Sequence, residues 1–199
     1  MRRSAARTRL QILDAAYGLF WRQGFLRVSM DRIAARAGIT KRALYQHFRS
    51  KDALMAATLA YSSELALSRL GQFRKPVTSD GLIESYFAEL RDWAKKPKYS
   101  GAGFTRAVVE LADLRGHPAR AIARKHKSAV EKWLADEFAA TGTVSAGDRA
   151  KEVMLLTEGA MALILIHGDP GWANSAARAA KQLLQTRQTA RVRTAVSSR

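Results

Sequence analysis

The stretch MDRIAARAGITKRALYQHF, residues 30–48, decides how the N-terminal part of this chain folds. Ser29, just before it, is placed to cap one short helix, and Thr40 is placed to cap a second. Gly38 stands between them and tolerates the positive φ that a tight turn needs. Ala34 is small enough to lie where two helices cross. The segment therefore predicts two short helices that meet at a sharp turn.

Two apolar residues after the turn complete the pattern. Ile39 is suited to fill the crevice between the helices, and Leu44 lies on the inner face of the second helix. This arrangement is typical of a helix-turn-helix, whose second helix enters the major groove of DNA with its N-terminal residues toward the bases. Electrostatic attraction alone would not require this order of small, flexible and apolar residues.

Polar residues on and beside the second helix suit contact with DNA. The Thr40 hydroxyl can reach a phosphate, and Lys41 and Arg42 lie in the first turn, where side chains reach base edges. Arg42 can pair with a guanine or merely with a phosphate. Tyr45 can give its hydroxyl to the DNA backbone or serve as a packing group. Lys51 begins the next helix and can approach flanking phosphates.

The charge of the chain is concentrated in the same region. The 199 residues carry a net charge of +17, and residues 1–52 hold +9 of it, with twelve basic and three acidic residues. A concentrated basic segment suits a polyanion, either nucleic acid or an anionic membrane surface. A surface charge that merely keeps the protein soluble is the other interpretation. The charge does not decide between them, whereas the helix-turn-helix pattern favours DNA.

Helical periodicity dominates the rest of the chain. A first helix ends at Gly24, and Ser50 is placed to cap a fourth helix that runs to about Leu70. Residues 71–80 are typical of a linker. Further helices are predicted near residues 82–94, 102–115, 118–140, 147–167 and 173–188. Ser145 and Asp148 resemble a capping box before the eighth helix.

The predicted fold is all-α, with about nine helices. A three-helix DNA-binding domain with the helix-turn-helix occupies residues 1–52, and a fourth helix joins it to a C-terminal helical bundle at residues 53–189. Residues 190–199 form a basic tail that we expect to be disordered, because this end of the chain carries arginines and no acid.

A family resemblance extends over residues 12–54. The sequence ILDAAYGLFWRQGFLRVSMDRIAARAGITKRALYQHFRSKDAL resembles the N-terminal domain of the TetR (tetracycline-repressor-like) regulators. The resemblance implies phosphate contacts from Ser29, Thr40, Tyr45 and Lys51, and base reading by Lys41 and Arg42. Arg42 departs from the pattern, because the family often has a small residue there.

The resemblance also implies partners for the C-terminal helices. It implies a homodimer that binds a palindromic double-stranded DNA operator, and an unidentified small-molecule effector that controls a repressor. The last two helices would form the dimer interface. The expected interface residues are small or apolar: Gly159, Ala162, Leu163, Ile166, Ala177, Ala180 and Leu184. An ordinary central core helix is the alternative for this segment.

An effector cavity is a further implication, bounded by the C-terminal helices. Candidate lining residues, each of which could equally be plain core, are Phe87, Trp93, Phe104, Val108, Trp133, Met154 and Met161. The polar candidates are His117, His126 and Glu158, of which His117 is interpreted best as part of a turn. The pattern assigns no effector-binding residue.

Other classes of protein find little support. The motifs of nucleotide-binding, metalloprotease and serine-hydrolase sites are absent, so we predict no catalytic residue and no enzyme. There is no cysteine, and the four histidines show no ligand spacing, so we predict no metal and no cofactor. No apolar run approaches the roughly 18 residues of a membrane span. The sequence predicts a cytoplasmic protein that does not bind membranes.

Overall fold

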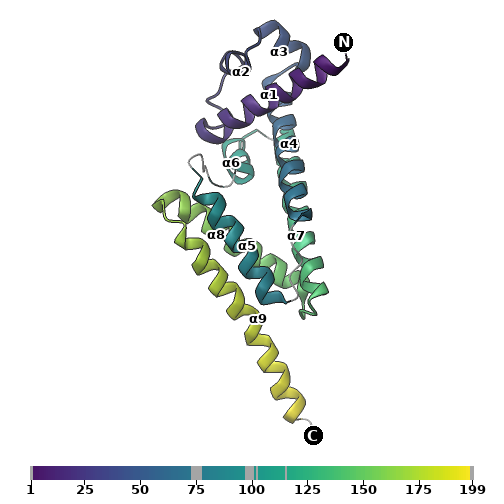
Figure 1. The fold of residues 1–199 in the computed structure, drawn as a ribbon, viewed down its shortest axis with the longest axis vertical. Coiled ribbons are helices and arrows are strands. Elements are labelled where there is room, and N and C mark those ends of the chain that lie inside the picture. Colours follow the sequence, from purple (N-terminus) through teal and green to yellow (C-terminus); the bar gives the residue numbers. More distant parts are fainter. Residues whose placement is uncertain (1, 73–77, 97–100, 102, 115, 198–199) are drawn as a thin grey trace. The chain divides into compact units, whose positions relative to one another are not determined.

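The computed structural model describes residues 2–72, 78–96, 101, 103–114 and 116–197, with the backbone alone in residues 2–4 and 186–197. In these residues there are nine helices and no strand, which confirms the predicted all-α fold. Their bounds, which Figure 1 allows the reader to follow, are α1 Arg2–Gln23, α2 Met30–Arg36, α3 Lys41–His47, α4 Lys51–Gly71, α5 Ser79–Ala94, α6 Gly103–Glu110, α7 Pro118–Ala140, α8 Ala146–His167 and α9 Gly171–Ser197.

The chain packs as two compact units. The first unit contains residues 1–72 and 103–128, and the second contains residues 73–102 and 129–199. Helix α7 therefore runs through the boundary between them. The functional division expected after residue 52 stays a prediction, but packing divides the chain elsewhere, because α4, α6 and the start of α7 share a core with the first three helices.

Local sequence signals set the helix ends of the first unit. The hydroxyl oxygens of Ser29, Thr40 and Ser50 accept hydrogen bonds from backbone N–H groups three residues later, which confirms the predicted N-caps of α2, α3 and α4. Helix α1 ends where Gly24, with a φ of +93°, donates its N–H to the carbonyl of Phe20.

The turn between α2 and α3 is closed by the backbone. Gly38 has a φ of +64°, and its N–H donates to the carbonyl of Ala35, while the N–H of Ile39 donates to the carbonyl of Ala34. This pair of hydrogen bonds is a Schellman motif, which requires a left-handed residue between its two halves. Ala34 is buried and Ile39 packs against the core. The predicted helix-turn-helix is confirmed.

The core of the first unit is apolar and continuous. Phe20 and Phe25 stack with ring centroids 5.1 Å apart, and both are fully buried. Ile33 of α2, Leu44 of α3 and Leu54 of α4 are fully buried in the same cluster. Burying each such side chain contributes about 1.5–3 kcal/mol. Helices α2 and α3, which have seven residues each and are too short to be stable alone, are held together by this core.

Helix α6 belongs to this core because it packs against the end of α1. Phe104 meets the Trp21 indole edge-on with centroids 6.1 Å apart, and Phe104 and Ala107 are buried. Gly103 lies directly under the same indole: a Cβ on this residue would stand 2.0 Å from ring atoms of Trp21. The first turn of α6 can approach α1 this closely only because residue 103 has no side chain.

The second unit is built from α5, α8, α9 and the C-terminal half of α7. Helix α9 packs against both α8 and α5. Arg149, only 4% exposed, pairs with Glu152 at 2.5 Å and donates to the carbonyl of Leu183 at 3.0 Å, which fastens α8 to α9. At the end of α8, Gly168 has a φ of +68° and donates to the carbonyl of Ile164.

Two predicted details are wrong. Helix α6 ends at Glu110 and not near residue 115, because the chain continues in turns from Leu111. Ser145 has a left-handed backbone and makes no side-chain cap, because the tight turn before α8 leaves its carbonyl, and not its hydroxyl, facing the amides of Asp148 and Arg149. Helix α9 extends to Ser197, and the expected disorder of the tail at residues 190–199 stays a prediction.

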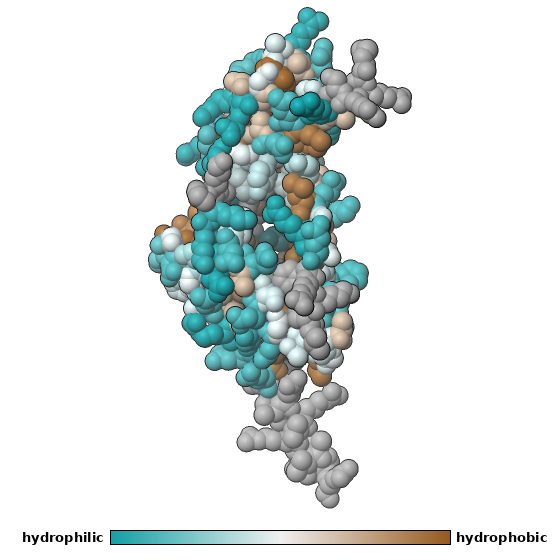
Figure 2. Space-filling view, in the orientation of Figure 1, coloured by the Kyte–Doolittle hydropathy of each residue, from teal (hydrophilic) through white to brown (hydrophobic). Residues whose placement is uncertain are grey.

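The face of the molecule drawn in Figure 2 is largely hydrophilic. On the face in Figure 2, apolar residues lie in small, separate patches among hydrophilic ones. Among the described helices, none combines the length and the apolar character that crossing a membrane requires.

The packing of Gly103 leads to a stability prediction. Gly103→Ala should lower the free energy of unfolding by about 1–3 kcal/mol, the usual cost of overpacking a core. Gly147→Ala is the matched control, because a Cβ there meets nothing within 4 Å, and it should be neutral or slightly stabilising. Urea unfolding followed by circular dichroism measures both. Equal stability of the two variants would contradict the proposed packing.

Candidate nucleic-acid interface

The polar residues expected to contact DNA lie on one short segment of surface. Ser29, Thr40, Lys41, Arg42 and Tyr45 are all exposed. The hydroxyl oxygens of Ser29 and Thr40 already accept cap hydrogen bonds, at 3.3 and 3.1 Å. A hydroxyl can donate while it accepts, so both groups keep a hydrogen that can be given to a phosphate. The caps hold these donors in fixed orientations.

Lys41 is engaged by an acid of the preceding helix. Its Nζ lies 2.9 and 3.1 Å from the two carboxylate oxygens of Asp31. The hydrogen bond to Asp31, followed by the charge of that carboxylate, raises the pKa of Lys41 above its usual value of 10.5. Both side chains are more than half exposed, so water and salt screen the pair. Lys41 is therefore charged and available, but a phosphate has to compete with Asp31.

Arg42 and Tyr45 are the other outward residues of α3. Tyr45 is 42% exposed. In the part of the chain that the structure describes, no ion pair holds Arg42, which leaves its planar guanidinium group open toward solvent. An arginine in the first turn of a recognition helix has the reach and the paired donors to bind a guanine edge.

Lys51, which is predicted to approach flanking phosphates, also makes a contact within the protein. It is half-buried, and its Nζ donates to the carbonyl of Leu26 at 2.7 Å. Partial burial lowers the pKa of Lys51 below its usual value of 10.5, although the charges of Asp52 and Glu110 oppose the shift. The ammonium group is thus held in place by the turn between α1 and α2.

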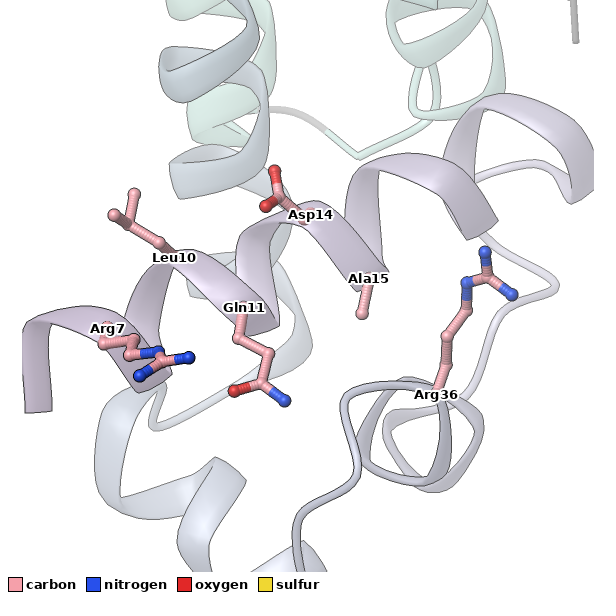
Figure 3. A pocket seen from close by; sticks show the side chains of 6 residues that line it. All are labelled: Arg7, Leu10, Gln11, Asp14, Ala15 and Arg36. Atoms are coloured by element: carbon pink, nitrogen blue, oxygen red, sulfur yellow. The ribbon is translucent and has the colours of Figure 1, made fainter. Parts of the chain in front are cut away.

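A shallow hollow of about 670 Å³ lies beside the helix-turn-helix (Figure 3). Arg7, Leu10, Gln11, Asp14 and Ala15 line it from α1, and Arg36 lines it from α2. Gln11 donates through Nε2 to the carbonyl of Ala37 at 2.7 Å, which ties α1 to the end of α2 just before the turn.

Helix α6 supplies residues that the sequence analysis did not identify. Glu110 accepts the backbone N–H groups of Phe25 at 2.6 Å and Leu26 at 3.1 Å, and Arg106 donates to the carbonyl of Trp21 at 3.1 Å. These contacts join residues about 85 positions apart. In the sequence, only Gly24 indicated a tight backbone turn at this point. Nothing in the sequence indicated that Glu110 and Arg106 would bind this turn.

The residues expected at a dimer interface separate into two groups. Gly159, Ala162 and Ile166 are exposed on α8, with Ile166 at 71%, and Leu163 is half-buried. The three from α9 are buried in the second unit itself: Ala177 at 8%, Ala180 at 1% and Leu184 at 8% exposed. These three offer little surface to a partner, because their face of α9 packs within the second unit, where α9 contacts α5 and α8.

The candidate cavity residues also separate. Phe104 and Val108 pack with the core of the first unit, whereas the other five belong to the second unit, where Phe87 and Met161 are buried. His117 lies at the start of α7, where its Nδ1 accepts the N–H of Ala119 at 3.1 Å, as expected for a turn residue. In the described part of the chain, no group of three or more histidine or acidic side chains could hold a metal ion.

The fold and its exposed capped turn define a helix-turn-helix protein, and the comparisons with known proteins agree with this class. Residues 12–58 match the family described as "Bacterial regulatory proteins, tetR family". The transcriptional regulator UidR of Escherichia coli K12 is 38% identical over 89 residues, covering 43% of this chain and 44% of UidR. TtgR of Pseudomonas putida is 42% identical over 55 residues, covering 28% of this chain and 26% of TtgR.

Solved structures share the whole fold. The reduced form of E. coli NemR superposes with a TM-score of 0.81 at 20% identity, covering 90% of this chain and 99% of NemR. A TetR-family regulator from Streptomyces coelicolor gives 0.78 at 24% identity, covering 91% and 96%. The family match is confined to the N-terminal part of the chain, residues 12–58, and the chain spans less than half of the length of the curated relatives it matches.

The Lys41–Asp31 pair leads to a prediction about ionisation. Asp31→Asn should lower the pKa of Lys41 toward 10.5, because the hydrogen bond to a carboxylate and its charge are the main causes of the raised value. The ε-CH₂ resonances of Lys41, followed by NMR between pH 8 and 12, measure it. Asp136→Asn, which removes the similarly exposed partner of Lys132, is the control and should leave the titration of Lys41 unchanged.

Proposed function

We propose that this protein is a sequence-specific transcriptional regulator, a ligand-responsive repressor that acts as a homodimer on a palindromic DNA operator. The observation that carries the proposal is the exposed first turn of α3, where Lys41 and Arg42 follow a capped, backbone-closed turn. Ser29, Thr40, Tyr45 and Lys51 would contact phosphates beside it. The match of residues 12–58 to the tetR family and the regulators among the similar proteins support the same conclusion.

Sequence reading is assigned to Lys41 and Arg42. Phosphate contacts fix the position of a protein on DNA, whereas contacts with base edges in the major groove distinguish sequences. The N-terminus of α3 adds free backbone N–H groups and a positive dipole end toward the DNA. The net charge of +9 on residues 1–52 would add attraction that does not depend on sequence and that weakens with salt.

The dimer is assigned to the exposed stripe of α8. Leu155, Gly159, Ala162 and Ile166 follow one another at spacings of four, three and four residues, and a Cβ on Gly159 would meet nothing within 4 Å. An apolar stripe with small residues at its centre suits close packing against the same stripe of a second copy. A dimer would place two recognition helices about 34–36 Å apart, one turn of DNA.

An effector would act by favouring one arrangement of the dimer over another. The second unit, from which the dimer stripe projects, is the region proposed to bind it. Helix α7 runs through the boundary between the units and provides a continuous covalent connection. A coupling of about 1–3 kcal/mol would change operator occupancy by a factor of about 5 to 150.

Selection of DNA from a random pool tests sequence reading. The protein should enrich a palindrome and bind it more tightly than random DNA across salt concentrations. Arg42→Lys, which keeps the charge but loses the paired donors, should remove about 1–3 kcal/mol of discrimination at one base position and leave the salt dependence unchanged. Arg178→Lys on α9 is the control. Equal affinity of the wild-type protein for selected and random DNA would refute the proposal.

Substitution on the stripe tests the dimer. Ile166→Glu should convert a dimer into a monomer, because it places a charge in the proposed apolar contact. Val109→Glu is the matched control, since Val109 is 69% exposed but lies on α6. Light scattering coupled to size-exclusion chromatography measures the mass. A monomeric wild-type protein, or an Ile166→Glu dimer, would count against this assignment.

A further inference from the structure

Two side chains of α6 form hydrogen bonds with the main chain at the turn between α1 and α2. One carboxylate oxygen of Glu110 accepts the N–H groups of Phe25 at 2.6 Å and Leu26 at 3.1 Å. The other accepts the Nε of Arg106 at 2.6 Å, and Arg106 also donates to the carbonyl of Trp21 at 3.1 Å. The ion pair therefore binds the last turn of α1 and the residues that follow it.

Gly24 is the residue that lets the pair come so close. Its φ is +93°, and a Cβ on it would stand 2.8 Å from Oε1 of Glu110 and 2.9 Å from Nη2 of Arg106. Any side chain would be strained by the backbone conformation and would also displace the pair. The turn and the ion pair are thus fitted to each other.

The other side of Leu26 is bound by Lys51. The carbonyl of Leu26 accepts the Lys51 ammonium at 2.7 Å, while its N–H is held by Glu110. Leu26 is therefore fixed between α6 and the first residue of α4. The same short segment leads to Ser29, the cap of α2. Glu110 therefore supports the main chain beside two of the proposed phosphate contacts, those of Lys51 and Ser29.

The ionised state of Glu110 favours the same contacts as its position does. Burial raises the pKa of Glu110, but the hydrogen bonds from Arg106, Leu26 and Phe25 outweigh it, so that the pKa lies below its usual value and the group is ionised at neutral pH. Burial lowers the pKa of Lys51, and the charges of Asp52 and then Glu110 oppose this by favouring its charged form. An ammonium group has three donors, so two remain for a phosphate after Leu26 has taken one.

We infer that Glu110 is a positioning residue for DNA binding, which sets the place of the Lys51 ammonium group by holding Leu26. The inference rests on the proposed function. Its consequence is that α6, far from the recognition helix in sequence, contributes to the affinity for DNA through one main-chain turn. Loss of Glu110 should therefore weaken DNA binding by weakening the contact of Lys51.

A double-mutant cycle tests this connection. Glu110→Gln, Lys51→Met and the double variant are compared on the DNA selected by the wild-type protein, by fluorescence anisotropy over a range of salt. Glu110→Gln should weaken binding about fivefold or more, the lower end of typical couplings between sites. The double variant should bind no more weakly than Lys51→Met alone. Each variant should reduce the salt slope by about 0.9, the share of one phosphate contact.

Two further measurements separate positioning from general damage. Glu84→Gln makes the same change of charge in another ion pair, with Lys181 in the second unit, and should leave DNA affinity unchanged. Hydrogen exchange at the amides of Phe25 and Leu26 should be faster in Glu110→Gln, while the core amides of α1 stay protected. If Glu110→Gln fails to fold, Arg106→Gln, which loosens the same carboxylate, replaces it in the cycle.

The outcomes distinguish the inference from the function on which it rests. Additive effects of Glu110→Gln and Lys51→Met, or an unchanged affinity in Glu110→Gln, overturn the positioning role while the regulator remains. A wild-type protein that does not prefer any selected DNA overturns both. Non-additive effects with a reduced salt slope support both.

Discussion

The left-handed backbone at Gly38 is the constraint on which the DNA-binding surface depends. Two main-chain hydrogen bonds close around it, from Gly38 to Ala35 and from Ile39 to Ala34, and they fix the direction in which α3 leaves α2. Because α2 and α3 have seven residues each, neither would persist without the core beneath them. The turn sets the angle between α2 and α3, and the packing of their buried faces maintains that angle.

The basic N-terminal segment, residues 1–52, contains few acids. The first 52 residues contain three, and each faces a partner: Asp14 accepts the Tyr61 hydroxyl at 3.1 Å, Asp31 pairs with Lys41, and Asp52 lies 3.6 Å from Nε2 of His117. Most of the basic excess is therefore not cancelled locally. Asp31 is the exception that bears on DNA, since it holds a residue proposed to read bases.

Much of the fold could be predicted because its signals are local. Caps at Ser29, Thr40 and Ser50 and the glycines at 24 and 38 mark helix ends through interactions within four residues of chain, and these were correct. The prediction failed at Ser145, where the backbone conformation of the turn overrode the side-chain signal. Ser145 has the right neighbours for a cap, but the turn before it forces a backbone conformation in which its hydroxyl cannot serve.

The sequence by itself determined the all-helical fold, the helix-turn-helix and the identity of the exposed residues on α3, because periodicity and capping act over one or two turns. Only the tertiary structure decided which surfaces remain free. It placed Ala180 inside the second unit, tied Lys51 to Leu26, and brought Glu110 to a turn 85 residues away. Contacts of that range depend on how whole helices pack, and no local pattern encodes the partner of a single carboxylate.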